Sequence, residues 1–214
     1  MALEYILFDL DDTIYPRSTP IMPTIGEKIK TFMVDSLGLS YEEAAERRLY
    51  FNRKYGTVLR GLLQEEVVDI EAYLNFVHDI PVEGFIEPNP DLQHALSVLS
   101  QRKYIFTNSY RKHAENVLRV LGISEFFEGI FDIQTVNFVS KPAKYPYAMI
   151  VSLLDTEPDK CVYIDDNPRN LKEPKLMGMK TVLVDSEPDE YVDISSVNIV
   201  EACYAIEAMI QKQR

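Results

Sequence analysis

The stretch with the clearest chemistry is Tyr5-Ile6-Leu7-Phe8-Asp9-Leu10-Asp11-Asp12-Thr13, in which an apolar run leads directly into three acids and a hydroxyl group. The apolar part is typical of a buried strand, so the acids should emerge where that strand ends. Three carboxylates this close repel one another, and without a cation or hydrogen-bond donors some would take up protons. The run indicates a divalent metal site. The alternative is an acidic turn in which Asp12 or Thr13 caps a helix.

Further polar side chains follow two other predicted strands. The run Tyr104-Ile105-Phe106-Thr107 leads into Asn108, and Lys160-Cys161-Val162-Tyr163-Ile164 leads into Asp165-Asp166. Each pair also has a simpler interpretation, because Thr107 could cap a helix and two acids before Asn-Pro suit an ordinary turn. Their common position after strands is what favours a shared site.

Lys141 lies in the polar loop after another predicted strand, Ile130-Phe131-Asp132-Ile133. It could be a solvated lysine, which is the commoner situation for lysine side chains. Lys144, three residues later, competes for the same role. The residues alone leave the choice between the two lysines open.

The elements that must position these residues alternate between strand and helix from Asn89 onward. Helices are predicted over 89–102, 114–121, 146–154, 168–177 and 199–210, and a fifth strand over 180–184. Such alternation predicts an α/β fold, a Rossmann-like parallel sheet covered on both faces, and these sheets bind ligands outside the carboxyl ends of their strands.

The stretch between the first strand and Asn89 is predicted to be entirely helical. Prolines from Pro16 to Pro23 exclude a continuous helix at its start, and Ser40 with Glu43 forms a capping-box pattern. Helices are predicted over 25–37, 40–55, 57–64 and 69–78. We therefore expect a core domain of residues 1–15 and 88–214 and a helical cap domain of residues 16–87.

Composition limits the class of partner. The net charge of −12 argues against a nucleic acid polymer, because phosphate backbones are bound by many Lys and Arg together. No segment predicts a membrane span and no signal peptide is visible, so a cytoplasmic protein is expected. Cys161 and Cys203 both lie in apolar patterns that suit reduced core thiols.

Taken in order, these motifs resemble the four conserved loops of the haloacid dehalogenase (HAD) superfamily of phosphohydrolases, over essentially the whole chain. The opening of the chain, together with Tyr55-Gly56-Thr57-Val58-Leu59-Arg60-Gly61-Leu62, is more weakly similar to the pyrimidine 5′-nucleotidase branch. The matching segments are Phe8-Asp9-Leu10-Asp11-Asp12-Thr13, Thr107-Asn108, Lys141-Pro142 and Asp165-Asp166.

The resemblance implies hydrolysis of a phosphate monoester through an aspartyl-phosphate intermediate. Asp9 would be the nucleophile and Asp11 the general acid and base. Thr107 and the Asn108 amide would hold the phosphoryl oxygens, and Lys141 would balance their charge. Lys141 is preferred to Lys144 because the Pro that follows it and its position at the end of the loop fit the pattern of the family. The same resemblance implies Mg²⁺ bound by Asp9, the Asp11 carbonyl and Asp166, with Asp165 acting directly or through water.

The resemblance also implies that the cap selects the leaving group. Tyr55, Arg60 and Arg17 are candidates for contacting a base or sugar, and each could equally be a surface or packing residue. The leading expectation is a nucleoside 5′-monophosphate as substrate. Alternatives are a sugar-phosphate phosphatase, a phosphomutase, a dehalogenase, which Asp11 disfavours because a halide leaving group needs no acid, or a binding module without activity.

Overall fold

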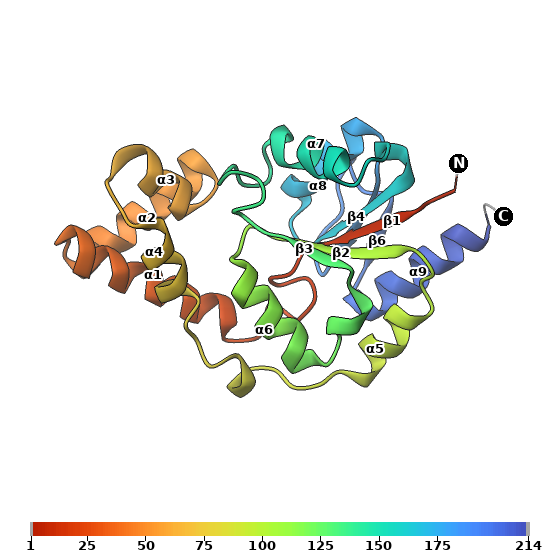
Figure 1. Ribbon diagram of the computed structural model, residues 1–214, viewed down its shortest axis with the longest axis horizontal. Helices are drawn as coiled ribbons and strands as arrows, with labels where there is room; N and C mark the ends of the chain where they lie inside the picture. Colours follow the sequence, from red (N-terminus) through yellow and green to blue (C-terminus); the bar gives the residue numbers. More distant parts are fainter. Residues whose placement is uncertain (1, 213–214) are drawn as a thin grey trace.

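The computed structural model describes residues 2–212, which form an α/β protein around a parallel sheet (Figure 1). The sheet order is β3-β2-β1-β4-β5-β6, and every neighbouring pair is parallel. The strands are β1 (Tyr5–Phe8), β2 (Arg102–Phe106), β3 (Gly129–Phe131), β4 (Cys161–Asp165), β5 (Lys180–Val184) and β6 (Ile194–Ser196).

Strand β1 lies in the middle of the sheet and is buried on both faces. Ile6 and Phe8 contribute to one apolar core, whereas Tyr5 and Leu7 contribute to the other, because successive side chains of a strand point to opposite faces. Phe8 pairs with Ile105 of β2 and with Ile164 of β4. The loops after these three strands therefore leave the sheet side by side at one edge.

Helices cover the sheet on both sides (Figure 1). On the Ile6 side, the core receives residues of α5 (Pro90–Ser97), α6 (Arg111–Leu121) and α9 (Ile199–Gln211). On the Leu7 side, it receives residues of α7 (Lys144–Leu153) and α8 (Pro168–Met177). Short 3₁₀ helices cover Val82–Gly84, Ser124–Phe126 and Pro158–Lys160. Cys161 and Cys203 are buried and free, as expected.

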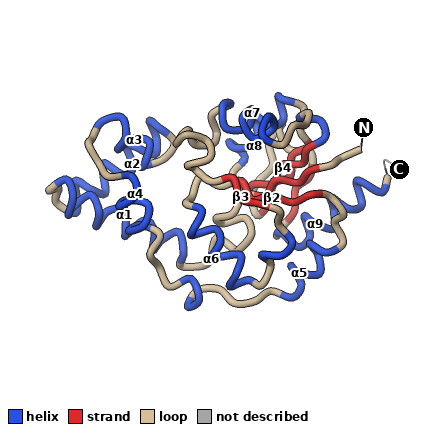
Figure 2. The backbone as a smooth tube through the Cα atoms, in the orientation of Figure 1, coloured by secondary structure: helices blue, strands red, loops and turns tan. Residues whose placement is uncertain are grey.

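Four helices lie apart from the sheet, at the left of Figure 2, and form the cap. They are α1 (Ile21–Leu37), α2 (Tyr41–Tyr55), α3 (Val58–Glu65) and α4 (Ile70–Val77). The capping box predicted at the start of α2 is present, with Ser40 and Glu43 each accepting from the backbone amide of the other. The predicted fold class, a Rossmann-like core with an inserted helical cap, is confirmed. The limits 16–87 for the cap domain stay a prediction.

Several elements differ from the sequence prediction. Helix α1 begins at Ile21, whereas the sequence predicts a start at residue 25. Pro23 fits in the first turn because the amide groups there have no acceptor within the helix, so no hydrogen bond is lost. Helix α5 ends at Ser97, not near residue 102, and β2 begins at Arg102. The short strand β6 was not predicted, since only its pairing with β5 defines it.

No helix in the described part of the chain has both the length and the apolar character needed to cross a membrane.

Candidate active site

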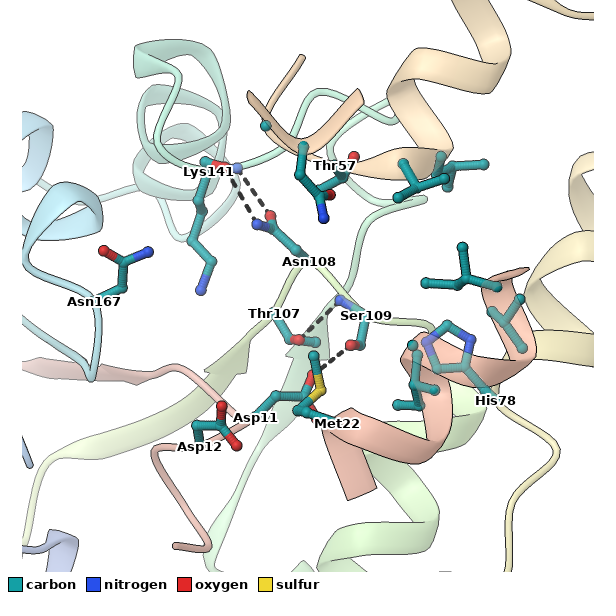
Figure 3. Close-up of a pocket in the computed structure, with 18 of the residues that line it drawn as sticks. Asp11, Asp12, Met22, Thr57, His78, Thr107, Asn108, Ser109, Lys141 and Asn167 are labelled. Atoms are coloured by element: carbon teal, nitrogen blue, oxygen red, sulfur yellow. Dashed lines mark hydrogen bonds between the residues drawn. The ribbon is translucent and has the colours of Figure 1, made fainter. Parts of the chain in front are cut away.

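The site is a cavity of about 370 Å³ between the carboxyl edge of the sheet and the cap (Figure 3). We call the part formed by the loops after β1, β2, β3 and β4 the floor, and the part formed by α1, α2, the Thr57–Leu59 segment and α4 the roof. The floor includes Asp9, Asp11, Thr107, Lys141 and Asp166. The structure therefore brings residues from all four predicted loops to one cavity.

The floor begins where β1 ends. The Asp9 amide still continues the sheet, donating to the Ile164 carbonyl at 2.9 Å. Asp12 then turns the chain with a φ of 62°, a left-handed conformation that Asp tolerates better than most residues. Thr13 follows, and its hydroxyl donates to Asp9 Oδ2 at 2.9 Å and accepts from the Asp166 amide at 3.0 Å. Thr13 thus joins the first loop to the fourth, a role that its place in the motif did not reveal.

Three buried carboxylates meet at this point. Asp9, Asp165 and Asp166 each offer an oxygen, and these atoms lie within 4.8 Å of one another. Asp166 also forms an ion pair with Arg17, so Arg17 contacts the floor of the site. This cluster of hard oxygen atoms contains the three carboxylates that the family resemblance implies as metal ligands.

Lys141 lies beside the carboxylates, with its side chain 1% exposed. Its Nζ is 2.5 Å from Asp9 Oδ1, 3.2 Å from Asp165 Oδ2, 2.8 Å from the Phe106 carbonyl and 2.9 Å from the Tyr163 hydroxyl. Lys144, by contrast, is exposed at the start of α7. Of the two lysines that competed in the sequence, the structure brings Lys141 to the acids.

The electrostatics of the floor reflect this crowding. Burial raises the pKa of Asp9. The charges of Asp165 and Asp166 raise this pKa further, and the Lys141 ammonium lowers it. Burial and Asp165 likewise raise the pKa of Asp166, against the effect of Arg17. For Lys141, burial lowers the pKa, but Asp9 and Asp165 outweigh burial and the net direction is upward. Negative charge is therefore in excess in the floor.

Both carboxylate oxygens of Asp165 already accept hydrogen bonds from the protein. Its Oδ1 accepts from the Asn167 amide at 2.9 Å, and both oxygens accept from Asn170 Nδ2 at 3.0 Å. Its Oδ2 also accepts from the Tyr163 hydroxyl. Asp166 is less committed to protein donors, and its carboxylate borders the cavity.

Asp11 has a different environment, made by three residues that sequence reasoning missed. Its Oδ1 accepts from the Tyr15 hydroxyl at 2.6 Å and lies 2.9 Å from His113 Nε2, and its Oδ2 accepts from the Ser109 hydroxyl. Burial raises the pKa of Asp11, but His113, Ser109 and Tyr15 together outweigh burial and hold the pKa well below its usual range. Tyr15 stands four residues from Asp11, and this spacing was the one available signal. The contacts of Ser109 and His113 with Asp11 are formed by the tertiary structure.

Thr107 and Asn108 directly follow β2, which ends at Phe106 and not at Thr107 as the sequence predicts. Thr107 is buried, and its Oγ1 accepts from the Ser109 amide at 2.9 Å. The Asn108 side chain accepts from the Lys141 amide at 2.8 Å and donates to the Lys141 carbonyl at 3.2 Å (Figure 3). Asn108 thus fixes the backbone of the Lys141 loop against the end of β2.

The roof contains other residues than those the sequence indicated. The Tyr55 hydroxyl donates to Glu65 at 2.6 Å, and neither Tyr55 nor Arg60 lines the cavity among the described residues. Arg48 and Asn52 of α2 line it instead, with Tyr73 of α4. The i, i+4 spacing of Arg48 and Asn52 placed them on one helix face, but it did not say which face meets the sheet.

A family model described as "Hydrolase: haloacid dehalogenase-like hydrolase" matches residues 3–178. Phosphate metabolism protein 8 of Saccharomyces cerevisiae (strain ATCC 204508 / S288c) is 29% identical over 215 residues, which are 93% of this chain and 66% of the yeast protein. Phosphoglycolate phosphatase of Aquifex aeolicus (strain VF5) is 23% identical over 186 residues, 85% of this chain and 84% of that protein. A HAD phosphatase structure from Thermococcus onnurineus has a TM-score of 0.63 at 19% identity and covers 95% of this chain and 98% of its own.

Proposed function

This chain belongs to the haloacid dehalogenase-like hydrolases, and from that premise we propose that it hydrolyses small phosphate monoesters through an aspartyl-phosphate intermediate. The observation that carries the proposal is the position of Asp9, which meets the Lys141 ammonium at 2.5 Å and faces one cavity together with Asp11 and Thr107. A nucleoside 5′-monophosphate, and a pyrimidine nucleotide first, is the proposed substrate.

Each residue of the floor has a role in the proposed reaction. A carboxylate oxygen of Asp9 attacks phosphorus and forms an acyl phosphate, while the bond from phosphorus to the ester oxygen breaks and Asp11 supplies the proton of the leaving alcohol. Water then attacks the same phosphorus, Asp11 takes up its proton, and phosphate leaves with Asp9 restored. Lys141, Thr107 and the Asn108 amide stabilise the charge on the phosphoryl oxygens.

The surroundings of Asp11 support its role in the second step. His113, Ser109 and Tyr15 hold the pKa of Asp11 low, so the carboxylate is in the form that accepts a proton from water. The other role of Asp11, protonation of the leaving oxygen in the first step, would have no counterpart in a dehalogenase, because a halide leaves without protonation. Phosphate chemistry therefore suits this floor better than cleavage of a carbon–halogen bond.

The donor set of the floor fits Mg²⁺. Oxygen ligands and an excess of negative charge around Asp9 and Asp166 are what a hard divalent cation requires. We propose Asp9, the Asp11 carbonyl and Asp166 as ligands, with Asp165 contributing through water, because its own oxygens already accept from Asn167 and Asn170. When bound, the ion would neutralise charge between the nucleophile and the phosphoryl group.

The size of the cavity supports a nucleotide rather than a two-carbon ester. At about 370 Å³ it falls within the range of roughly 300–1,000 Å³ that is typical of sites for drug-sized ligands. A sugar phosphate is smaller than a nucleotide and would fill less of the cavity. A phosphomutase using the same intermediate would differ only in excluding water from the second step.

The test is phosphate release from UMP, CMP, AMP, ribose 5-phosphate and phosphoglycolate with and without Mg²⁺, using Asp9→Asn as the control. We expect release from the parent protein with Mg²⁺, fastest with UMP and CMP, and a loss of at least about a thousandfold in Asp9→Asn. Equal rates in the parent and Asp9→Asn would refute the nucleophile. Fast hydrolysis of ribose 5-phosphate with none of UMP would refute the nucleotide but not the chemistry.

Binding of the metal has a readout that needs no activity. We expect Mg²⁺ to raise the melting temperature of the parent protein, because a ligand that binds only the folded state stabilises it, by about 2.7 kcal/mol at a hundred times its dissociation constant. The shift should be much smaller in Asp166→Asn. Identical shifts in the two proteins would remove Asp166 from the ligand set.

A further inference from the structure

The roof contains an arginine, Arg48 of α2, that lines the cavity and forms no ion pair among the described residues. Within residues 2–212, no carboxylate lies within 4.0 Å of the Arg48 guanidinium, and its buried Nε makes no hydrogen bond. The neighbouring Arg47 is different, because its guanidinium pairs with Glu65 at 3.4 Å and also with Glu66. Arg48 instead borders the cavity.

The helix that faces Arg48 leaves room for it. Gly26 lies in the interior of α1, where glycine is an unfavourable choice. A Cβ at this position would stand 2.9 Å from Arg48 Nη2 and 3.2 Å from Cζ. The absence of a side chain at residue 26 therefore allows the guanidinium its position at the cavity.

The other groups around this part of the cavity are mostly apolar, including Ile25, Ile29 and Leu74. A guanidinium that is partly buried among apolar side chains and has no acceptor is unfavourable until an acceptor binds. Its planar set of donors suits a pair of oxygen atoms in one plane. Asn52, one turn further along α2, adds an amide that can both donate and accept.

We propose that Arg48, assisted by Asn52, is the specificity residue that recognises acceptor oxygens in the leaving group of the substrate. This inference rests on the proposed phosphatase function, in which the floor binds the phosphoryl group and the roof faces the leaving group. The acceptor is a carbonyl oxygen of a pyrimidine base or, with the same chemistry, a carboxylate.

The experiment compares two matched pairs of esters. UMP and ribose 5-phosphate differ by the base, and phosphoglycolate and ethyl phosphate differ by the carboxylate. In Arg48→Met, which keeps the length of the side chain, we expect the preference in kcat/KM for the acceptor-bearing ester to fall about 10- to 100-fold. The kcat/KM for the ester without the acceptor should change less than about threefold. A reduced preference for UMP over ribose 5-phosphate would identify the acceptor as a carbonyl oxygen of the base. A reduced preference for phosphoglycolate over ethyl phosphate would identify it as a carboxylate.

Two further variants separate specificity from folding. Arg53→Met, at an exposed position on the same helix, should leave both preferences unchanged. Arg48→Lys keeps the charge but loses the planar fork, so it should restore only part of the preference. If Arg48→Met lowers kcat/KM by the same factor for all four esters, or for none, the inference is wrong.

Binding without turnover distinguishes this inference from the proposed function. In the Asp9→Asn background, calorimetric titration should show UMP or phosphoglycolate binding about 10- to 100-fold more weakly after Arg48→Met. Unchanged binding of both compounds would overturn the role of Arg48 whatever reaction the floor performs. Persistent activity of Asp9→Asn would overturn the proposed mechanism. The role of Arg48 would then be decided by the binding measurement alone.

Discussion

The floor and the roof of the cavity are stabilised in different ways. In the floor, acidic groups are buried together around a single lysine, and Lys141 alone has four potential acceptors within 3.2 Å. In the roof, apolar side chains dominate, and the Arg48 guanidinium has no acidic partner within the described residues.

This difference follows from the elements that carry the two regions. Apart from Lys141, the floor residues follow β1, β2 and β4, strands whose register is fixed by pairing on both sides, as Phe8 is fixed between Ile105 and Ile164. The roof residues stand on helices of an inserted unit, which can vary without disturbing the sheet. A charged floor with fixed geometry suits a single reaction. A roof with unused hydrogen-bond donors suits selection of the leaving group. The predictions below test this division, beginning with the largest effect.

Replacing Lys141 by methionine should damage the floor most. The change leaves the buried Asp9 and Asp165 without their cation, and removing one member of a buried ion pair typically costs 3–5 kcal/mol. We expect the free energy of unfolding in urea to fall by about that amount at pH 7 without Mg²⁺, and phosphate release to be lost. Lys144→Met, at an exposed lysine that begins α7, is the control and should change little. An equally stable Lys141→Met would show that the floor does not depend on paired charge.

How far the sequence could anticipate these regions depends on the range of the interactions. Asp9, Asp11, Lys141 and Asp166 stand next to recognisable strands or loops, so their meeting at one sheet edge followed from the alternation of strands and helices. His113 could not be assigned to Asp11 in this way, because its contact depends on how α6 packs against the loop that carries Asp11. Ser109, three residues after the end of β2, stands at the same sheet edge, but its position alone does not say which acid it meets.

The roof was less predictable for the same reason. An amphipathic helix shows which residues share a face, but the packing of α2 against α1 decides which face meets the cavity. The sequence therefore pointed to Tyr55 and Arg60, and the structure places Arg48 and Asn52 at the cavity. Gly26 had no visible role until its distance to Arg48 was known.

The second prediction separates the two steps assigned to Asp11. Asp11→Asn should lower kcat for UMP about 10²- to 10⁴-fold, because proton transfer by a positioned group contributes that much. With p-nitrophenyl phosphate, whose leaving group needs no acid, the first step should remain fast. Stopped-flow absorbance should then show a burst of nitrophenol equal to the enzyme concentration, followed by slow turnover. The absence of any burst would contradict an acid role for Asp11.

The third prediction concerns the place where roof and floor meet. His78 follows α4, and its ring lies 5.2 Å from that of His113, the residue that contacts Asp11. Burial lowers the pKa of His78 to about 4, and the neighbouring His113 lowers it in the same direction. Since an unfolded histidine has a pKa of about 6.5, the unfolded chain binds the proton first as the pH falls, and stability is lost between pH 6.5 and pH 4.

Between pH 7 and pH 4.5 this loss should amount to roughly 2 kcal/mol, after allowance for the partial exposure of His78. In His78→Gln, which cannot titrate, the fall in the free energy of unfolding over that range should be smaller by about this amount. Urea denaturation at the two pH values measures it, and His94→Gln, at an exposed position, is the control. A difference between the parent and His78→Gln that does not change with pH would assign the acid sensitivity to other groups.

The smallest effect on stability is expected from Gly26→Ala, which alters the roof alone. A methyl group at residue 26 would meet the mobile end of Arg48, so the guanidinium can shift without moving the backbone. Alanine in a helix interior is favoured over glycine by roughly 0.5–1 kcal/mol, and the free energy of unfolding should therefore stay level or rise slightly. The displaced guanidinium should nevertheless lower the preference for UMP over ribose 5-phosphate, while hydrolysis of ribose 5-phosphate is maintained. Steady-state kinetics and urea denaturation of one preparation measure both quantities. A variant that loses activity on both esters would show that the roof positions the floor, and the division between the two regions would then fail.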